Sequence, residues 1–322
     1  MAGQRDFSYF PYQHRICHHV YNNGGCTFCG FHTLKRCVSP TPVSDQEMIH
    51  HFNVFVNDKK HMDSLLKYGK ILVETNGSWF TEMPRAVREH IYKFVENNKI
   101  ELHTQCRATV INLQKTQEAM GIMLWRRGMH NSLSEPVAKE MAQMAYEAID
   151  TELKTYMLIF TGLEVADDND LKLLNKGCTL EDFVLFSEFV RKRGAMVGAN
   201  VLIKPPLIEN HIHKALMSAK YGFEVLRSTE VSFCCCIPFK GTVGHRLWRE
   251  AKWDPPSLAE CSEILKQTRD KYLSENPRRD VSFYNPRVQC HHGKYTGRKV
   301  KTERQKALVR ANVRRIAAEV FK

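Results

Sequence analysis

The sequence predicts an α/β fold: a partial (β/α)6 barrel over residues 10–240, followed by a helical and basic extension over residues 241–322. Apolar, strand-like segments alternate with amphipathic helical segments along most of the 322 residues. Five or six such units suit an open barrel better than a small doubly wound sheet. Residues 287–322 differ, because they hold eleven Lys or Arg and two Glu, a net charge of +9.

The predicted strands are short apolar runs, each followed by a turn signal. They cover residues 71–74, 100–103, 155–160, 195–203 and 230–238. The sequence TNGS over 75–78 ends the first strand, Gly162 closes the third, and Pro205 and Pro206 stop the fourth. Strands joined by helices run parallel, so their carboxyl ends meet at one edge, where we expect the chemistry.

The predicted helices follow these strands. They cover residues 82–98, 136–153, 180–193, 210–226, 258–273 and 303–321. Pro136 suits a first helical turn, and Thr179 with Asp182 resembles a capping box, although Glu or Gln is commoner at the second position. Gly194 is expected to end the third helix. The last helix carries an apolar stripe and lies among basic residues. It is expected either to pack on the domain or to form a basic arm that contacts phosphates.

The charge balance bounds the partners. Lys and Arg number 47 against 35 acidic residues, a net charge of +12, which favours a polyanionic partner without requiring one. No apolar run approaches the roughly 20 residues needed to cross a bilayer. The first residues lack the apolar segment of an export signal, so we expect a cytoplasmic protein with reduced thiols. Its eleven cysteines should be core residues or metal ligands.

Three cysteines lie close together near the start of the chain. Cys17, Cys26 and Cys29 have the spacing C-x8-C-x2-C, and the glycines at 24 and 25 let the loop fold back toward Cys17. Cys26 and Cys29 flank a tight turn, so both thiolates can face one metal.

Three interpretations of this cluster remain. The cysteines are ordinary buried residues, although a CxxC after two glycines is a poor core pattern. They form a zinc knuckle that His18, His19 or Cys37 completes, although zinc sites usually draw two ligand pairs. Or three thiolates hold a [4Fe–4S] cluster and leave one iron open.

Several segments resemble one enzyme superfamily. The chain is similar to radical S-adenosylmethionine (SAM) proteins of the Elp3-like group, and Phe28 fits their cluster loop. The similarity is greatest to the radical SAM subunits of archaeosine synthase, and YhcC-like proteins share the GLE…NKG pattern. The segments span about residues 12–260: GGCTFCGF, ETNGSWFTEMP, TGLEVADDNDLKLLNKGCTLEDF, NVLIKPP and LWREAKWDPPSL.

The resemblance implies a chemistry. The open iron binds SAM, the reduced cluster donates an electron, and the resulting 5′-deoxyadenosyl radical abstracts hydrogen from a substrate. The implied substrate is a modified nucleoside in tRNA, at the lyase step on a 7-deazaguanine of the archaeosine type. The resemblance also implies a reductant such as ferredoxin or flavodoxin, and the short chain implies a partner subunit that delivers the substrate.

The resemblance also assigns site residues. Cys17, Cys26 and Cys29 are the expected cluster ligands. Glu164 and Lys204 are the expected catalytic residues, because a buried charge at the end of an apolar strand is costly and is rarely placed there for packing alone. The expected SAM-binding residues are Phe28, Asn76, Gly77, Ser78, Arg107, Gly162, Glu164, Lys176, Asn200 and Lys204.

Some of these positions depart from the superfamily pattern or have plainer readings. TNGS over 75–78 lacks the acid of the Gly-Gly-Glu-type motif and also reads as an ordinary turn. Arg107 lies in TQCRA, where relatives carry an acid or a Ser-Arg-Pro pattern, and a surface arginine is the alternative. Lys176 follows the acidic DDND turn, so a solvated lysine at a helix end is its alternative.

Further cysteines and two other functions remain open. On an apolar strand Cys235 should point away from Cys234 and Cys236, which indicates core packing over an auxiliary ligand role. The 290–292 Cys-His-His sequence lacks a second ligand pair for a metal. The alternatives to tRNA chemistry are a radical SAM enzyme acting on a small molecule or protein, and a zinc-containing nucleic-acid-binding protein without catalysis.

Overall fold

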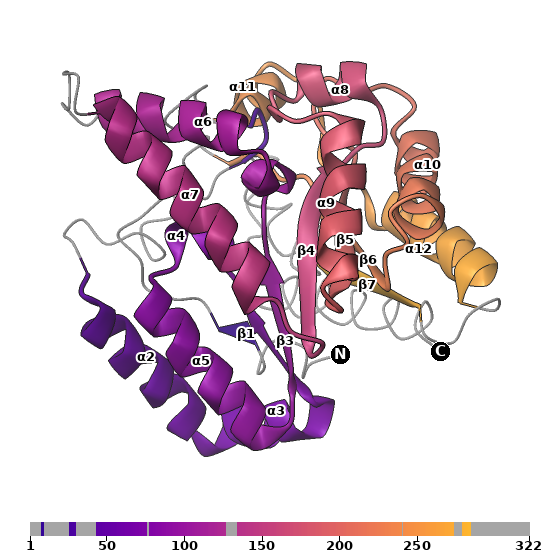
Figure 1. The fold of residues 1–322 in the computed structure, drawn as a ribbon. Helices are drawn as coiled ribbons and strands as arrows, with labels where there is room; N and C mark the ends of the chain where they lie inside the picture. Colours follow the sequence, from indigo (N-terminus) through magenta and orange to yellow (C-terminus); the bar gives the residue numbers. More distant parts are fainter. Residues whose placement is uncertain are drawn as a thin grey trace.

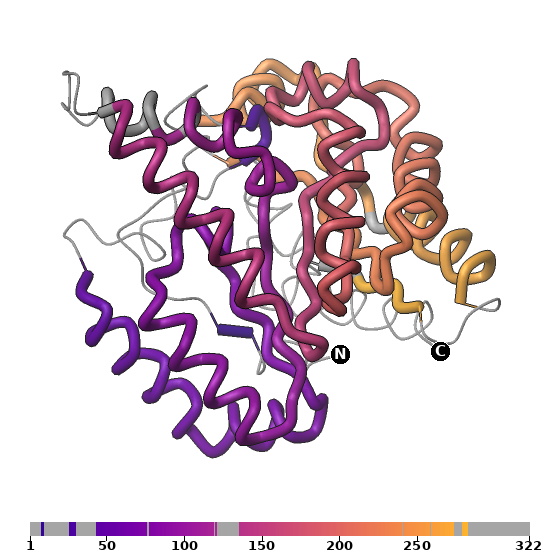
Figure 2. The backbone as a smooth tube through the Cα atoms, in the orientation of Figure 1, coloured from indigo at the N-terminus to yellow at the C-terminus, as the bar shows by residue number. Residues whose placement is uncertain are grey.

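One parallel sheet organises the protein. The computed structural model describes residues 8–9, 26–29, 43–75, 77–126, 134–239, 241–273 and 279–284, most of which Figure 2 traces in colour. Seven parallel strands form a half-barrel in the order of the sequence. They are β1 (Ser8–Tyr9), β2 (Lys70–Val73), β3 (Glu101–Gln105), β4 (Met157–Glu164), β5 (Met196–Ile203), β6 (Glu230–Cys235) and β7 (Asp280–Tyr284). The predicted α/β half-barrel is confirmed.

The helices form the outer layer around this sheet (Figure 1). Before β4 they are α2 (Asp45–Asn57), α3 (Lys59–Tyr68), α4 (Trp79–Glu82), α5 (Arg85–Asn98), the 3-10 helix η3 (Ala108–Ile111), α6 (Leu113–Arg126) and α7 (Ser134–Glu152). After β4 they are α8 (Asp168–Leu173), α9 (Leu180–Lys192), α10 (His211–Glu224), α11 (Val243–Arg249) and α12 (Leu258–Tyr272).

The core fills the space between sheet and helices. β4 and β5 are buried along nearly their whole length, as expected for a parallel sheet that is covered on both faces. Large side chains with almost no exposed surface anchor both halves of the molecule, among them Phe52, Trp79, Phe183, Phe223 and Phe233. The sheet is therefore a rigid base for residues at its carboxyl edge.

Two predicted elements end elsewhere than expected. The helix predicted over 82–98 begins only at Arg85, as α5, because Pro84 is its N-cap residue; Glu82 is the last residue of the separate helix α4. β4 does not end at Gly162 but continues to Glu164 through an irregularity in its pairing with β5. Glycine is compatible with an extended strand, and here it allows a close approach of side chains.

The helix signals around α9 are confirmed. The Thr179 side chain accepts a hydrogen bond from the Asp182 amide, and the Asp182 carboxylate accepts one from the Thr179 amide, completing a capping box. Gly194 follows α9 with a φ of +82°, a left-handed conformation that favours glycine. The chain then enters β5 within two residues.

The sheet reaches beyond residue 240. β7 pairs with β6 from Asp280 to Tyr284, so the region expected to be a helical extension also supplies the last strand. The basic residues of 287–322 and the helix predicted over 303–321 lie outside the described residues. Within the described part, none of the helices has the length and apolar character to cross a membrane.

Candidate functional site

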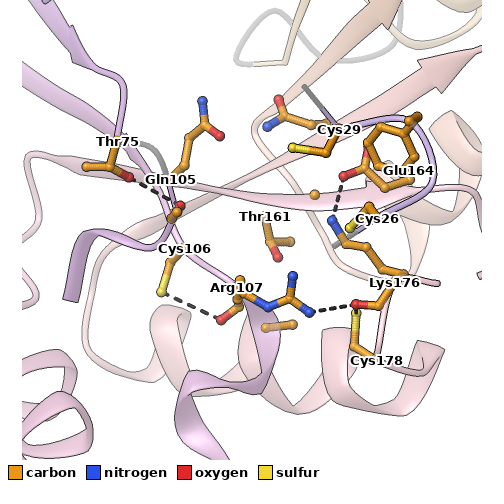
Figure 3. Close-up of a pocket in the computed structure, with 15 residues that line it drawn as sticks. Cys26, Cys29, Thr75, Gln105, Cys106, Arg107, Thr161, Glu164, Lys176 and Cys178 are labelled. Carbon is orange, nitrogen blue, oxygen red and sulfur yellow. Dashed lines mark hydrogen bonds and ion pairs between the residues drawn. The ribbon is translucent and has the colours of Figure 1, made fainter. Parts of the chain in front are cut away.

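A pocket opens at the carboxyl edge of the sheet (Figure 3). Its empty space is about 700 Å³ when the open mouth is included. Its walls come from the 26–29 turn, from strands β3–β5 and from the loops that follow β2–β4. The predicted residues that line it are Cys26, Phe28, Cys29, Gly77, Arg107, Gly162, Glu164, Lys176 and Asn200.

The CxxC turn is fixed by its backbone. The Cys29 amide donates to the Cys26 carbonyl at 3.1 Å, which closes the turn. The Thr27 amide donates to the Leu174 carbonyl at 3.0 Å, and the Thr27 carbonyl accepts from the Gly244 amide at 3.3 Å. Both thiols consequently face the pocket, while the third predicted ligand, Cys17, lies outside the described residues.

A buried ion pair forms part of the pocket wall. Lys176 Nζ lies 2.6 Å from Glu164 Oε1, and the two residues are only 8% and 7% exposed. Burial alone lowers the pKa of Lys176, but the charges of Glu164 and the nearby cysteines outweigh it and leave that pKa raised. Lys176 is thus a buried ammonium ion, and the alternative of a solvated lysine is wrong.

Gly162 makes room for this pair. A Cβ atom at this position would lie 2.5 Å from Lys176 Nζ and would also overlap the Glu164 carboxylate. Glu164 itself has a φ of +62°, a strained value for a residue with a side chain. The end of β4 is therefore shaped to bring both charges into the pocket.

The turn after β2 acquires an acid that the motif lacks. The Glu82 carboxylate accepts a hydrogen bond from the Ser78 amide, and a Cβ at Gly77 would lie 2.7 Å from the Glu82 carboxyl carbon. Glu82 is buried at the end of α4, four residues after Ser78 in ETNGSWFTE. Only the short α4 brings it back, so sequence reasoning missed it. Asn76 lies outside the described residues.

Arg107 and Ser78 support the pocket wall. Arg107 Nη2 donates to the Lys176 carbonyl oxygen at 2.6 Å and so holds the turn that carries the ammonium (Figure 3). The Ser78 hydroxyl accepts from the Arg107 amide at 3.3 Å and lies 2.9 Å from Cys106 Sγ. Ser78 is completely buried and does not line the pocket.

Lys204 is not brought into this pocket. It follows the last residue of β5, and its Nζ donates to Glu260 Oε1 at 3.0 Å, beside the His211 ring nitrogen at 2.8 Å from the same oxygen. Lys204, which was predicted to be catalytic together with Glu164, is therefore not among the described lining residues, and the partner of Glu164 is Lys176.

Six of the described lining residues were not predicted to bind a ligand, and three of them, Cys106, Cys178 and Thr161, carry sulfur or a buried hydroxyl. Cys106 and Cys178 face the pocket, and burial raises the pKa of Cys106 to about 12 and also raises that of Cys178. Thr161 Oγ1 is buried without a hydrogen-bond partner among the described residues. A threonine on an apolar strand gives no sequence signal, because only the packing of the folded chain leaves its hydroxyl without a hydrogen-bond partner.

The cysteines at 234–236 behave as packing residues. Cys235 Sγ lies 3.3 Å from Cys261 Sγ on α12, and both residues are buried. Burial raises the pKa of all three thiols, so they are poor nucleophiles in this environment. The predicted core role agrees with this, and residues 290–292 lie outside the described part.

The residues present fit an iron–sulfur cluster and SAM. Two thiols of a rigid turn face the pocket, a buried ammonium lies beside them, and the Thr161 hydroxyl lacks a partner among the described residues. Glycine at 162 leaves space that any other side chain would fill. Among the described residues no three His, Cys, Asp or Glu side chains form a metal site, and Cys17 is not one of those residues.

The chain is similar to curated archaeal proteins. It is 25% identical over 259 residues to the archaeosine synthase subunit beta of Methanosarcina acetivorans, covering 76% of this chain and 62% of that protein. It is 28% identical over 196 residues to the same subunit of Thermococcus kodakarensis, covering 60% and 57%. The predicted resemblance to this subunit is confirmed, and the chain spans about three fifths of the length of these relatives.

Solved structures with a similar arrangement share little sequence. A queuine lyase from Clostridium spiroforme, bound to SAM and queuine, has a TM-score of 0.44 at 14% identity, covering 85% of this chain and 89% of that one. The Elp3 of Methanocaldococcus infernus has a TM-score of 0.43 at 14% identity, covering 79% and 57%. No protein-family profile matches the chain.

Proposed function

We propose that the chain is a radical SAM enzyme that holds a [4Fe–4S] cluster by Cys17, Cys26 and Cys29 and binds SAM in the pocket beside it. The observation that carries this proposal is the meeting of the CxxC thiols and the buried Lys176–Glu164 pair in one pocket at the carboxyl edge of a parallel half-barrel. The similarity to archaeosine synthase subunit beta supports it.

The bound groups would supply reductive cleavage of SAM to a 5′-deoxyadenosyl radical. The residues of this chain bind and orient. The Lys176 ammonium offers a cation for the SAM carboxylate, and Glu164, Asn200 and the Thr161 hydroxyl offer acceptors and donors for its amino and ribose groups. Phe28 lines the pocket within the cluster turn, and its apolar ring would help to exclude water.

The backbone around Gly77 offers the second polar surface. The Glu82 carboxylate accepts from the Ser78 amide and therefore stabilises the turn, whose residues Thr75 and Gly77 line the pocket. Arg107 acts indirectly, because its guanidinium donates to the Lys176 carbonyl and so positions Lys176. Lys204 is paired with Glu260 outside the pocket, and we assign it no role in the reaction.

The proposed substrate is a modified nucleoside in tRNA, at a lyase step on a 7-deazaguanine. The named relatives and the net charge of +12 support this choice. Because both relatives are named as subunits of a synthase, we propose that a partner subunit delivers the RNA and that a ferredoxin or flavodoxin supplies the electron.

The test is anaerobic reconstitution of the full chain with iron and sulfide, followed by dithionite and SAM. We expect a brown protein that releases methionine and 5′-deoxyadenosine. Cys26→Ala and Cys29→Ala should lose iron and activity, whereas Cys178→Ala, in the same pocket but outside the ligand set, should keep its iron. Full activity in Cys26→Ala would refute the ligand assignment.

The substrate is tested separately by adding bulk tRNA and analysing its nucleosides by mass spectrometry. Loss of one modified nucleoside with SAM, and none without it, is the expected result. A colourless protein that retains zinc and produces no 5′-deoxyadenosine would favour the nucleic-acid-binding alternative instead.

A further inference from the structure

Helix α11 is attached to the cluster turn. The Gly244 amide donates to the Thr27 carbonyl at 3.3 Å, and a Cβ at Gly244 would touch Pro206, the second residue of the loop that follows Lys204, at 3.4 Å. The Thr242 hydroxyl caps the helix by accepting from the His245 amide at 3.1 Å. The helix is thereby fixed at the pocket end of the sheet, the end at which α8 also lies (Figure 1).

The outer side of α11 is basic. Arg246 and Arg249 lie three residues apart, so they share one helix face, and both are exposed. Neither guanidinium forms an ion pair with a described residue. Their acidic neighbour, Glu250, lies 2.9 Å from the Lys252 ammonium, and Arg246 interacts with it only through its charge. Two cations are therefore presented to solvent close to the turn that carries the CxxC thiols.

Aromatic rings lie beside these cations. The rings of His245 and Trp248 are 5.8 Å apart at an angle of 39°, and both residues are half-buried. Basic side chains interleaved with aromatic rings are typical of surfaces that contact single-stranded nucleic acid, in which bases stack and phosphates pair with cations.

The acids of the neighbouring α8 do not offset this charge. Lys214 Nζ lies 2.8 Å from Asp167 and 2.7 Å from Asp170, and the Asp168 carboxylate accepts from the Leu180 amide. These contacts hold the three carboxylates toward α9 and α10, and none of them forms a described ion pair with Arg246 or Arg249.

We propose that α11 is an RNA-contacting helix, in which Arg246 and Arg249 bind backbone phosphates next to the nucleotide whose base enters the pocket. The inference rests on the proposed function, because it takes the pocket as the place where the nucleoside reacts. Guanidinium groups suit phosphate, since their planar donors pair with two of its oxygens. Half-buried His245 and Trp248 add a stacking surface for a flanking base.

The test measures binding of a fluorescein-labelled tRNA transcript by fluorescence anisotropy at a series of salt concentrations. The variant is Arg246→Gln with Arg249→Gln in the full chain. The matched control is Arg191→Gln with Lys192→Gln, which removes the same charge from the exposed last turn of α9, just before β5 begins at the opposite end of the sheet. Arg246→Lys with Arg249→Lys keeps the charge.

The α11 glutamine variant should reduce the slope of log Kd against log salt by about 1.4 to 1.8, since each of the two phosphate contacts contributes about 0.7 to 0.9. The control and the lysine variant should keep most of the wild-type slope. An unchanged slope in the glutamine variant would overturn the inference, and so would a wild-type chain that binds no tRNA.

A second measurement separates this inference from the proposed function. SAM cleavage by reconstituted protein without RNA should be equal in the wild type and the glutamine variant, because neither arginine lines the pocket. Normal cleavage with an unchanged salt slope refutes the role of α11 alone. A reduced slope in a wild-type chain that never cleaves SAM refutes the proposed function and leaves the RNA contact standing.

Discussion

Replacing Lys176 by methionine should strongly destabilise the fold. The substitution keeps a similar length and removes the charge that faces Glu164 at 2.6 Å. At an effective dielectric constant of 20, the Coulomb attraction over that distance is about 6 kcal/mol. Desolvation of the two ions offsets much of this attraction, so the net contribution of the pair is small.

The large effect comes from the ion that is left behind. Glu164 is 7% exposed, and a buried carboxylate without its partner costs about 3 to 5 kcal/mol. The double variant with Glu164→Gln removes this penalty, so it should be more stable than Lys176→Met alone. We expect a coupling energy of about 2 kcal/mol or more between the two substitutions.

The assay is urea unfolding of the apo chain with reduced thiols, followed by circular dichroism. The raised pKa of Lys176 means that the contribution of the pair is complete below the ordinary lysine value of 10.5 and is lost as the pH rises through the higher folded value. The cycle is therefore measured at neutral pH. Additive effects, with a coupling energy below about 0.5 kcal/mol, would refute the arrangement described here.

Three further predictions concern other parts of the fold. Gly162→Ala should lower the free energy of unfolding by about 1 to 3 kcal/mol, because the added methyl group overpacks against the Lys176 ammonium. Gly244→Ala, whose methyl group meets only an ordinary van der Waals contact, should leave that free energy nearly unchanged. Equal urea midpoints for the two variants would contradict this prediction. Burial alone raises the pKa of Glu260, but hydrogen bonds from Ser257, Lys204 and His211 outweigh it and lower that pKa to about 2. The stability that the Glu260 carboxylate provides is thus present above pH 4.5 and lost as the pH falls toward 2. Glu260→Gln should therefore flatten the plot of thermal midpoint against pH between pH 4.5 and 2. An unaltered plot would show that these hydrogen bonds do not persist in solution. Thr179→Ala should cost about 1 kcal/mol by removing the cap of α9, and a change below about 0.3 kcal/mol in urea unfolding would mean that the capping box is not formed.

The sequence predicted the strands that carry strong apolar runs. β5 was expected over 195–203 and occupies Met196–Ile203, because a long apolar run between a glycine and two prolines leaves few alternatives. β7 was not expected, since its five residues begin with Asp and contain only two strongly apolar positions that alternate with polar ones. Short edge strands of this kind depend on pairing with a neighbour rather than on their own composition.

The sequence predicted which residues belong to the candidate site, but it did not predict which of them form ion pairs. Strand ends and motifs indicated that Glu164, Lys176 and Arg107 belong near the pocket. They could not show that Lys176 pairs with Glu164 or that Lys204 pairs with Glu260, because both pairs join residues from different elements. A charged pair inside a fold depends on helix placement and on the space left by Gly162, neither of which periodicity encodes.

The anchoring of the cluster turn has a consequence for assembly. Thr27 is held by the carbonyl of Leu174 and by the amide of Gly244, so the turn lacks part of its hydrogen bonding until the ribosome has added more than two hundred further residues. Cys26 and Cys29 are therefore synthesised long before the residues that fix their turn, while the sheet grows from one edge to the other in the order of synthesis. On the proposed function, the cluster would be inserted late, into the nearly folded chain.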